Sequence, residues 1–109
     1  MGKYVFIESR DPFESRDARF VVDTATALKR ADNEVTVFLV QNGVLASRDN
    51  ASGSHVPHLL RAGIAILADE FSVCERGIQP AEMTAAVKLS NIDALVDLLL
   101  RENTKAIWH

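Results

Sequence analysis

Cys74 is the only cysteine in this 109-residue sequence, and it is the first candidate for chemistry. It lies in Ser72-Val73-Cys74-Glu75, whose Ser-x-x-Glu spacing has the form of a capping box and predicts a helix that is capped by Ser72 and has Cys74 as its second residue. The second residue of such a helix gains from unpaired backbone N–H groups and from the helix dipole, which stabilise a thiolate. Nearby charges act in both directions: Arg76 favours the thiolate, and Asp69, Glu70 and Glu75 oppose it. Cys74 is therefore either a nucleophile or a small buried core residue, as free cysteines commonly are.

Polar residues also follow three predicted strands, at the place where a parallel sheet binds its ligands. Glu8, Ser9, Arg10 and Asp11 follow the strand predicted at 4–7, and Asn42 follows the strand predicted at 34–40. The strand predicted at 64–68 is followed by Asp69, Glu70, Ser72 and Arg76. Because the carboxyl ends of parallel strands meet at one edge of the sheet, these side chains predict a pocket at that edge.

Metal and nucleotide sites have little support. His55 and His58 have the spacing of two ligands on one helical turn, but zinc needs a third protein ligand, and His109 is the one other histidine. We expect solvated loop histidines and no metal. A pairing of Cys74 with a histidine distant in sequence stays open. The glycines never cluster into a phosphate-binding loop.

Strand-like and helix-like segments alternate along the chain, which predicts an α/β fold. Apolar runs predict strands at 4–7, 34–40, 64–68, 87–89 and 104–108. Helices are predicted from a cap at Ser15 to about Ala31, from Pro57 to Gly63, from Pro80 to about Ala86, and from a cap at Ser90. Right-handed crossovers then give a small doubly wound, mostly parallel five-stranded sheet with helices on both faces. The polar segment 46–55 is predicted to be a loop.

Composition limits the class of protein. A formal net charge of −3 with 48% hydrophobic residues is typical of a single soluble domain, here 1–109. The negative charge, without a Lys/Arg cluster in the sequence, argues against a nucleic-acid surface. No apolar run approaches the roughly 20 residues of a membrane span. One cysteine cannot form an internal disulfide, so we expect a cytoplasmic protein.

Four segments resemble the DsrE/DsrF-like family, which includes the sulfur-relay proteins of bacterial sulfur oxidation and of tRNA thiolation. They are the run from Glu34 to Val44, Ala62-Gly63-Ile64, Arg76-Gly77-Ile78, and Val87-Lys88-Leu89-Ser90 before a helix. The resemblance covers nearly the whole chain and implies a small doubly wound domain, usually assembled as a dimer, trimer or hexamer. It also implies that active members carry sulfur as a cysteine persulfide and pass it to other sulfur-relay proteins, without a metal or organic cofactor.

One position departs from the family pattern. In the sulfur-carrying members the functional cysteine closes the third strand, ahead of the Arg-Gly pair. Counting back from Gly77 places Asp69 there, and a carboxylate cannot accept a sulfane sulfur. The resemblance therefore implies a non-catalytic or partner-binding member of the sulfur-relay group. The alternative is an enzyme, a sulfurtransferase that carries a persulfide on Cys74.

A remote alternative comes from a different class of protein. Glu8, Asp11 and Asp69 after strands, with Ser90 after the fourth strand, loosely resemble a receiver domain that accepts a phosphoryl group beside Mg²⁺. Against this, Lys105 falls inside the last strand and not at its carboxyl end.

Large apolar residues near loops and at the terminus predict assembly. They are Phe13, Phe71, Ile107 and Trp108. Exposed aromatic residues of this kind are enriched at subunit contacts, so we expect a homo-oligomer. The alternative is that they cap the ends of the domain's own core.

Overall fold

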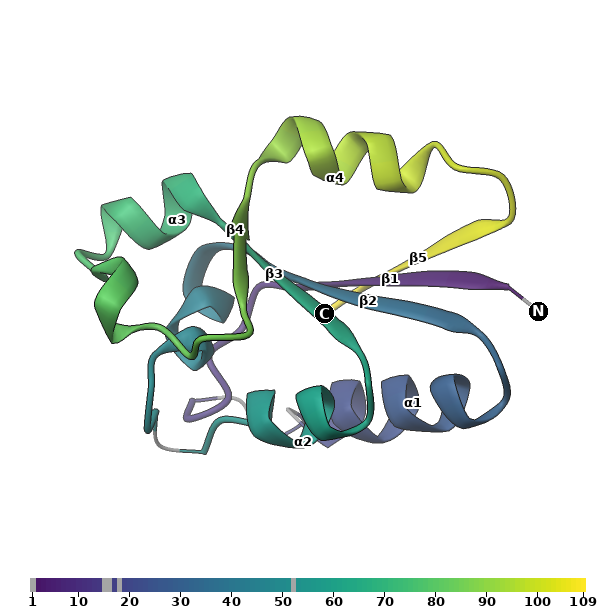
Figure 1. The fold of residues 1–109 in the computed structure, drawn as a ribbon, viewed down its shortest axis with the longest axis horizontal. Coiled ribbons are helices and arrows are strands. Elements are labelled where there is room, and N and C mark those ends of the chain that lie inside the picture. The colour runs from purple at the N-terminus through teal and green to yellow at the C-terminus, as the bar shows by residue number, and fades with distance from the viewer. Residues whose placement is uncertain (1, 15–16, 18, 52) are drawn as a thin grey trace.

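The computed structural model describes residues 2–14, 17, 19–51 and 53–109. Its centre is a five-stranded sheet in which all paired strands are parallel, in the order β4-β3-β2-β1-β5 (Figure 1). The strands are β1 Lys3–Glu8, β2 Glu34–Leu39, β3 Ala65–Asp69, β4 Lys88–Ser90 and β5 Thr104–Trp108. The chain winds from β1 out to β4 and then returns to place β5 on the other side of β1. The predicted doubly wound α/β sheet is confirmed, and its switch point lies between β1 and β5.

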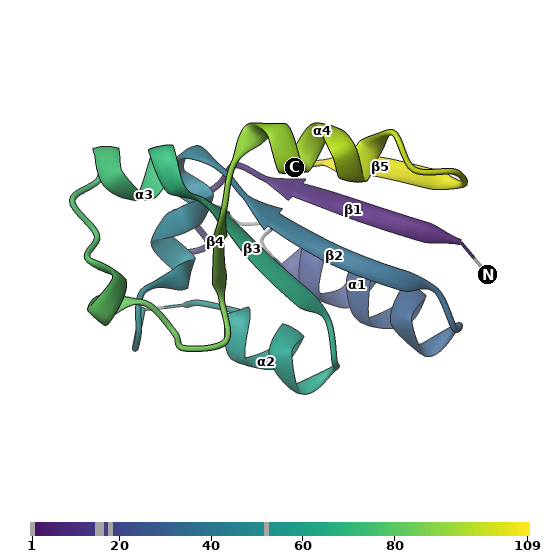
Figure 2. The same ribbon diagram turned by 45° about the horizontal axis from the view of Figure 1, so that its top comes forward.

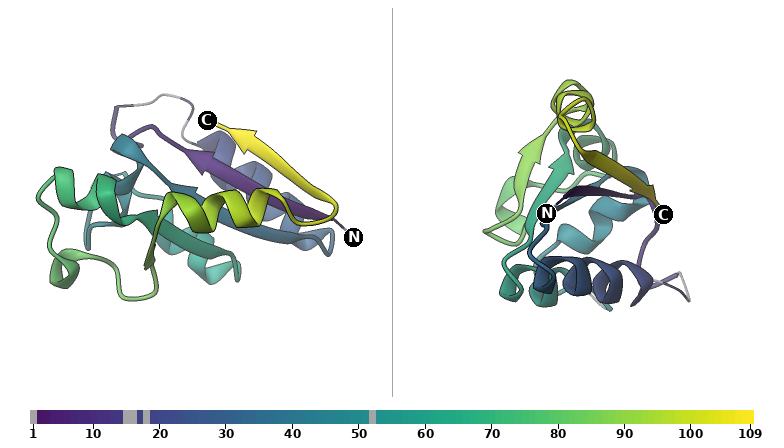
Figure 3. Two further views of the ribbon diagram at one scale, coloured as in Figure 1. Left: turned by 90° about the horizontal axis from the view of Figure 1, so that it is seen from above. Right: turned by 90° about the vertical axis from the view of Figure 1, so that its right-hand side faces the viewer.

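Helices cover both faces of this sheet. The helices α1, Arg19–Arg30, and α2, Val56–Arg61, lie side by side on one face, and α4, Ile92–Leu99, lies on the other (Figures 2 and 3). The short helix α3, Glu70–Glu75, follows β3 directly and contacts the 3-10 helix η1, Gln41–Ser47, which follows β2. Two connecting helices therefore gather at the carboxyl ends of the central strands. None of the described helices combines the length and the apolar character needed to cross a membrane.

The two faces of the sheet form two apolar cores. Phe6 of β1 and Val37 of β2 belong to the core under α1 and α2, whereas Val5, Ile7 and Phe38 pack toward α4. This alternation follows because successive side chains of a strand point to opposite faces of the sheet. A sheet covered on both faces buries both sets, which explains the continuous apolar runs in the sequence.

The observed boundaries correct several predictions. The N-cap of α3 is Asp69 and not Ser72, so the helix begins at Glu70. The helix predicted from Pro80 is only a three-residue 3-10 helix, η2, Pro80–Glu82. The first part of the segment predicted as a polar loop is helical in η1, and Ser47 within it is 0% exposed. Ser15, the predicted cap of the first long helix, lies outside the described residues.

Candidate functional site

The strongest candidate site is a cavity of about 480 Å³ at the carboxyl ends of the strands. It opens beside the switch point, because β1 and β5 contribute Ile7 and Trp108 to its lining. The other lining residues come from the segments after β2 and β3 and from α4: Val40, Gln41, Asn42, Asp69, Phe71, Ser72, Glu75, Arg76, Ile92 and Leu95.

Asp69 is the best-anchored polar residue of this cavity. It is the last residue of β3 and the N-cap of α3, and it is only 4% exposed. Its Oδ2 accepts a hydrogen bond from the Ser72 backbone N–H at 3.1 Å and another from the Ser72 hydroxyl at 2.7 Å. The Ser72 Oγ in turn accepts from the backbone N–H of Gln41 at 2.9 Å. This chain of hydrogen bonds ties the end of β3 to the segment after β2.

Arg76 is held in place on the same side of the cavity. Its Nε and Nη2 donate to Oδ1 of Asn42 at 3.1 and 3.0 Å, and its Nη1 donates to the Ser72 carbonyl at 3.2 Å. The planar guanidinium is thereby fixed between η1 and α3. Asn42 and Arg76 are 34 residues apart in sequence, so the fold brings this pair together.

Apolar side chains form the rim of the cavity. Phe71, Ile92 and Trp108 line it, and they are 67%, 51% and 66% exposed. Phe13 is also exposed, at 71%, but it does not line this cavity. Ile107 is half-buried and packs against the core under α1 and α2, so it is a core residue.

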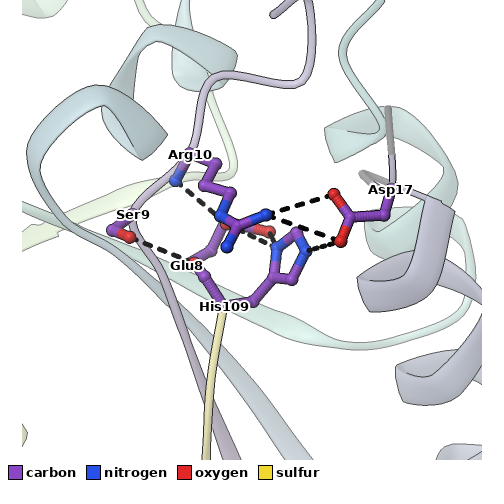
Figure 4. A network of polar contacts seen from close by, with 5 residues as sticks. All are labelled: Glu8, Ser9, Arg10, Asp17 and His109. Atoms are coloured by element: carbon purple, nitrogen blue, oxygen red, sulfur yellow. Dashed lines mark hydrogen bonds and ion pairs between the residues drawn. The ribbon is translucent and has the colours of Figure 1, made fainter. Parts of the chain in front are cut away.

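A second polar cluster joins β1 to the end of β5 (Figure 4). The Nδ1 of His109 lies 2.9 and 2.8 Å from the two carboxylate oxygens of Glu8, and both side chains are 8% exposed. Asp17 lies 3.3 Å from His109 Nε2 and 3.2 Å from Nη1 of Arg10. The Ser9 hydroxyl donates to the His109 carbonyl at 3.1 Å.

Burial decides the electrostatics of Glu8. Desolvation raises the pKa of the Glu8 carboxyl above 4.5, while the Arg10 backbone N–H and His109 partly oppose this rise. The cluster therefore holds a carboxyl whose ionisation is opposed by burial and favoured by its hydrogen bonds to Arg10 and His109.

The residues predicted to share one pocket are divided between these places. Asn42, Asp69, Ser72 and Arg76 line the cavity, whereas Glu8, Ser9 and Arg10 belong to the His109 cluster. Asp11 accepts a hydrogen bond from the Phe13 backbone N–H at 3.1 Å, which closes a turn. Glu70 lies beside Cys74. The role of Gln41 was not predicted, because a backbone N–H leaves no sign in sequence.

Cys74 has surroundings different from those expected. It is the fifth residue of the six-residue helix α3, so the prediction that it lies at a helix start is wrong. It is also exposed, so the alternative prediction of a buried core residue is wrong as well. It lines a cavity of about 230 Å³ with Glu70, Val73, Gly77, Ile78, Gln79, Pro80 and Leu89, and this set includes no cation.

The described residues contain no candidate metal-binding site. No group of three or more histidine, cysteine, aspartate or glutamate side chains is arranged there to hold an ion. His55 precedes α2 and His58 lies within it, with ring centroids 6.3 Å apart.

The fold and the site define a small doubly wound α/β protein with a ligand-sized cavity at the carboxyl ends of its parallel strands. The chain belongs to the DsrE/DsrF-like family, whose model matches residues 2–105. Its structure is similar to that of the ychN protein from E. coli, with a TM-score of 0.87, 16% identity and 100% of both chains covered. It is also similar to the protein of unknown function MTH1491 from Methanobacterium thermoautotrophicum, with a TM-score of 0.77, 16% identity and the same coverage. Comparison with the curated proteins finds no match.

Proposed function

We propose that this DsrE-family protein works in sulfur relay as a partner-binding subunit that does not carry sulfur itself. The chain assembles with further copies of itself through the cavity at the strand ends. Its single cysteine suits a reducing cytoplasm. Other sulfur-relay proteins are then partners of the assembly.

The observation that carries this proposal is the position of Asp69 at the end of β3 and the use of its carboxylate as a helix cap. The family resemblance implies a carrier cysteine at the end of the third strand, and Asp69 is the last residue of β3. Its buried carboxylate already accepts two hydrogen bonds from Ser72. A carboxylate has no sulfur to form a persulfide, and this one is used to start a helix.

The rim of the cavity supports binding to another protein. Its exposed Phe71, Ile92 and Trp108 are the types of residue enriched at the centre of interfaces. The same lining holds an anion, Glu75, and a cation, Arg76. A twofold-related copy offers each of these charges its opposite, since a twofold interface presents the same patch from both sides. We therefore propose that a second copy of this chain occupies the cavity at the strand ends.

Solution mass tests the assembly. Light scattering at micromolar concentration is expected to give a multiple of the 12.0 kDa chain mass, and Trp108→Ser is expected to lower it. Phe13→Ser is the matched control, because Phe13 is equally exposed but lies outside this cavity. A mass near that of one chain for the unaltered protein would overturn the assembly.

Sulfur transfer is tested separately. The protein and an unstructured cysteine peptide are each incubated with one equivalent of a low-molecular-mass persulfide donor, and intact mass is recorded over time. A persulfide adds about 32 Da to a cysteine. We expect the protein to gain this mass no faster than the peptide does. A faster gain that is lost in Cys74→Ser would contradict the non-carrier proposal.

That contrary result would support the second candidate function, a sulfurtransferase using Cys74. The exposure of Cys74 beside a cavity favours it, because a carrier thiol must meet both donor and acceptor. The receiver-like alternative has less support, since Glu8 and Asp69 lie in separate polar clusters. Mg²⁺-dependent labelling by acetyl phosphate would revive it.

A further inference from the structure

A further cavity lies apart from the polar site at the strand ends. Its volume is about 560 Å³, and it lies between α1 and α2, on the face of the sheet opposite α4. One face of each helix lines it, together with the residue before α2: Arg19, Val22, Asp23, Thr26 and Arg30, then His55, His58, Arg61 and Ala62. A volume of this size is in the range that holds a small organic molecule.

Positive charge dominates this lining. It contains three guanidinium groups and two imidazoles but a single carboxylate, although the whole chain has a net charge of −3. The sequence shows no basic cluster because the arginines are far apart along the chain, and only the packing of α1 against α2 brings them together. The folded surface therefore has a cluster of arginines, although the sequence has no Lys/Arg cluster.

The single carboxylate is already engaged. Asp23 lies 3.6 Å from Nη2 of Arg19, one helical turn away. Arg30 has no carboxylate within 4 Å among the residues described. Arg61 has its Nη2 2.9 Å from Nδ1 of His58, so its described polar partner is itself part of a basic group. Two of the three guanidinium groups thus have no carboxylate partner among the described residues.

These two free charges lie at the same end of the cavity. Arg30 is the last residue of α1 and Arg61 is the last of α2. The two ends are close in space, because a Cβ placed on Gly63 would lie 3.7 Å from Cε of Lys29. Helix C-termini oppose anions, each with about −0.5 of a charge, but the two guanidinium charges of Arg30 and Arg61 outweigh two such ends.

The charges at the other end of the groove act on His55. Burial lowers the pKa of His55 below 6.5, and Arg19 and His58 lower it further, with Asp23 alone opposing them. A groove whose charges disfavour an additional cation favours an anion.

We propose that the groove between α1 and α2 is a binding site for a small anionic molecule that presents a phosphate-type group to Arg30 and Arg61. Guanidinium groups match the geometry of phosphate oxygens and form paired charge-assisted hydrogen bonds with them. Thr26, one turn before Arg30, adds a hydroxyl to the lining, and Val22 and Ala62 add apolar surface for the rest of the ligand. This site is separate from the cavity of the proposed function and does not depend on it.

Isothermal titration at low ionic strength tests the site with two probes, inorganic pyrophosphate and ADP. Both are expected to bind saturably, and Arg30→Gln and Arg61→Gln are each expected to weaken binding at least about tenfold, the scale of one charge-assisted hydrogen bond. Tighter binding of ADP would identify a ligand with an organic body, and equal binding would identify the free phosphate group. Glutamine keeps the helix propensity at both positions, and circular dichroism checks that the variants fold.

The matched control is Arg101→Gln, an exposed arginine 3.9 Å from Glu34 and outside this groove. It is expected to change binding less than twofold. Binding that fails to saturate at millimolar concentration, or that all three variants weaken equally, would overturn the proposal.

Discussion

The Asp69 carboxylate accepts two hydrogen bonds from Ser72, one from the backbone N–H at 3.1 Å and one from the side-chain hydroxyl at 2.7 Å. One aspartate therefore ends β3 and starts α3 with no intervening residue. The backbone of the cavity wall depends on this pair, because Ser72 also receives the N–H of Gln41.

Replacing Asp69 should destabilise the protein. Asp69→Ala is expected to lower the free energy of unfolding by about 1–3 kcal/mol, because it removes a helix cap and leaves the buried Ser72 hydroxyl without its acceptor. Urea unfolding followed by circular dichroism measures the loss. Asp69→Asn is the matched control, since asparagine caps helices as well as aspartate does and should lose much less. Equal losses in the two variants would mean that the charge, and not the cap, matters.

Gly43 should tolerate no side chain. A Cβ there would overlap the carbonyl oxygen of Glu8 and approach the Glu8 carbonyl carbon at 2.9 Å. Both groups are backbone and cannot rotate away, so Gly43→Ala is expected to cost about 1–3 kcal/mol or more. Thermal unfolding compares it with Gly2→Ala, whose nearest neighbours would lie at 3.4 Å. An unchanged melting temperature for Gly43→Ala would show that β1 and η1 separate easily.

Most of the fold could be predicted from sequence because both faces of the sheet are covered. Segments such as 37–40 are apolar throughout, which is the pattern of a parallel strand between two helical layers. The sequence pattern predicts the N-cap of α3 three residues too late, for a local reason. Asp69 and Ser72 are both good caps three residues apart, and the pattern Ser-x-x-Glu favoured the second. In the structure Asp69 is the N-cap, because it lies at the end of a buried strand.

The candidate site was less accessible to prediction because its contacts are long-range. Glu8 and His109 are 101 residues apart and meet only because β5 returns to the edge of β1. Asn42 and Arg76 likewise meet through the packing of η1 against α3. Residue types at strand ends indicated the region, but the partners depend on the order of the strands.

Cys74 should be removable at little cost. Because it is exposed near the end of a short helix, Cys74→Ser is expected to change the free energy of unfolding by no more than about 0.5 kcal/mol. Its thiol should also react with a chromogenic disulfide reagent in the folded protein as fast as after unfolding in urea. Strong protection in the folded state, with a large loss of stability in the variant, would show instead that the thiol is packed in the core.

The buried carboxyl of Glu8 should make stability fall as pH rises. Its pKa is raised above 4.5 by burial, so between the unfolded and the folded pKa the native state binds more protons than the unfolded state. Stability from this group is fully present below pH 4.5 and is lost as pH rises through the folded pKa. Glu8→Gln keeps the shape and the acceptor for the Arg10 N–H but cannot ionise.

The advantage of the unaltered protein over Glu8→Gln in free energy of unfolding should therefore shrink as pH rises above 4.5. Urea titrations at stepped pH measure this difference, and Glu102→Gln, a change at an exposed glutamate, supplies the baseline. Arg10, Asp17 and His109 are the charged or titratable groups around Glu8 in the cluster, and Arg10 and His109 oppose the rise in the Glu8 pKa. If the difference grows with pH instead, the ion pair with His109 at 2.8 Å outweighs the burial of the carboxylate.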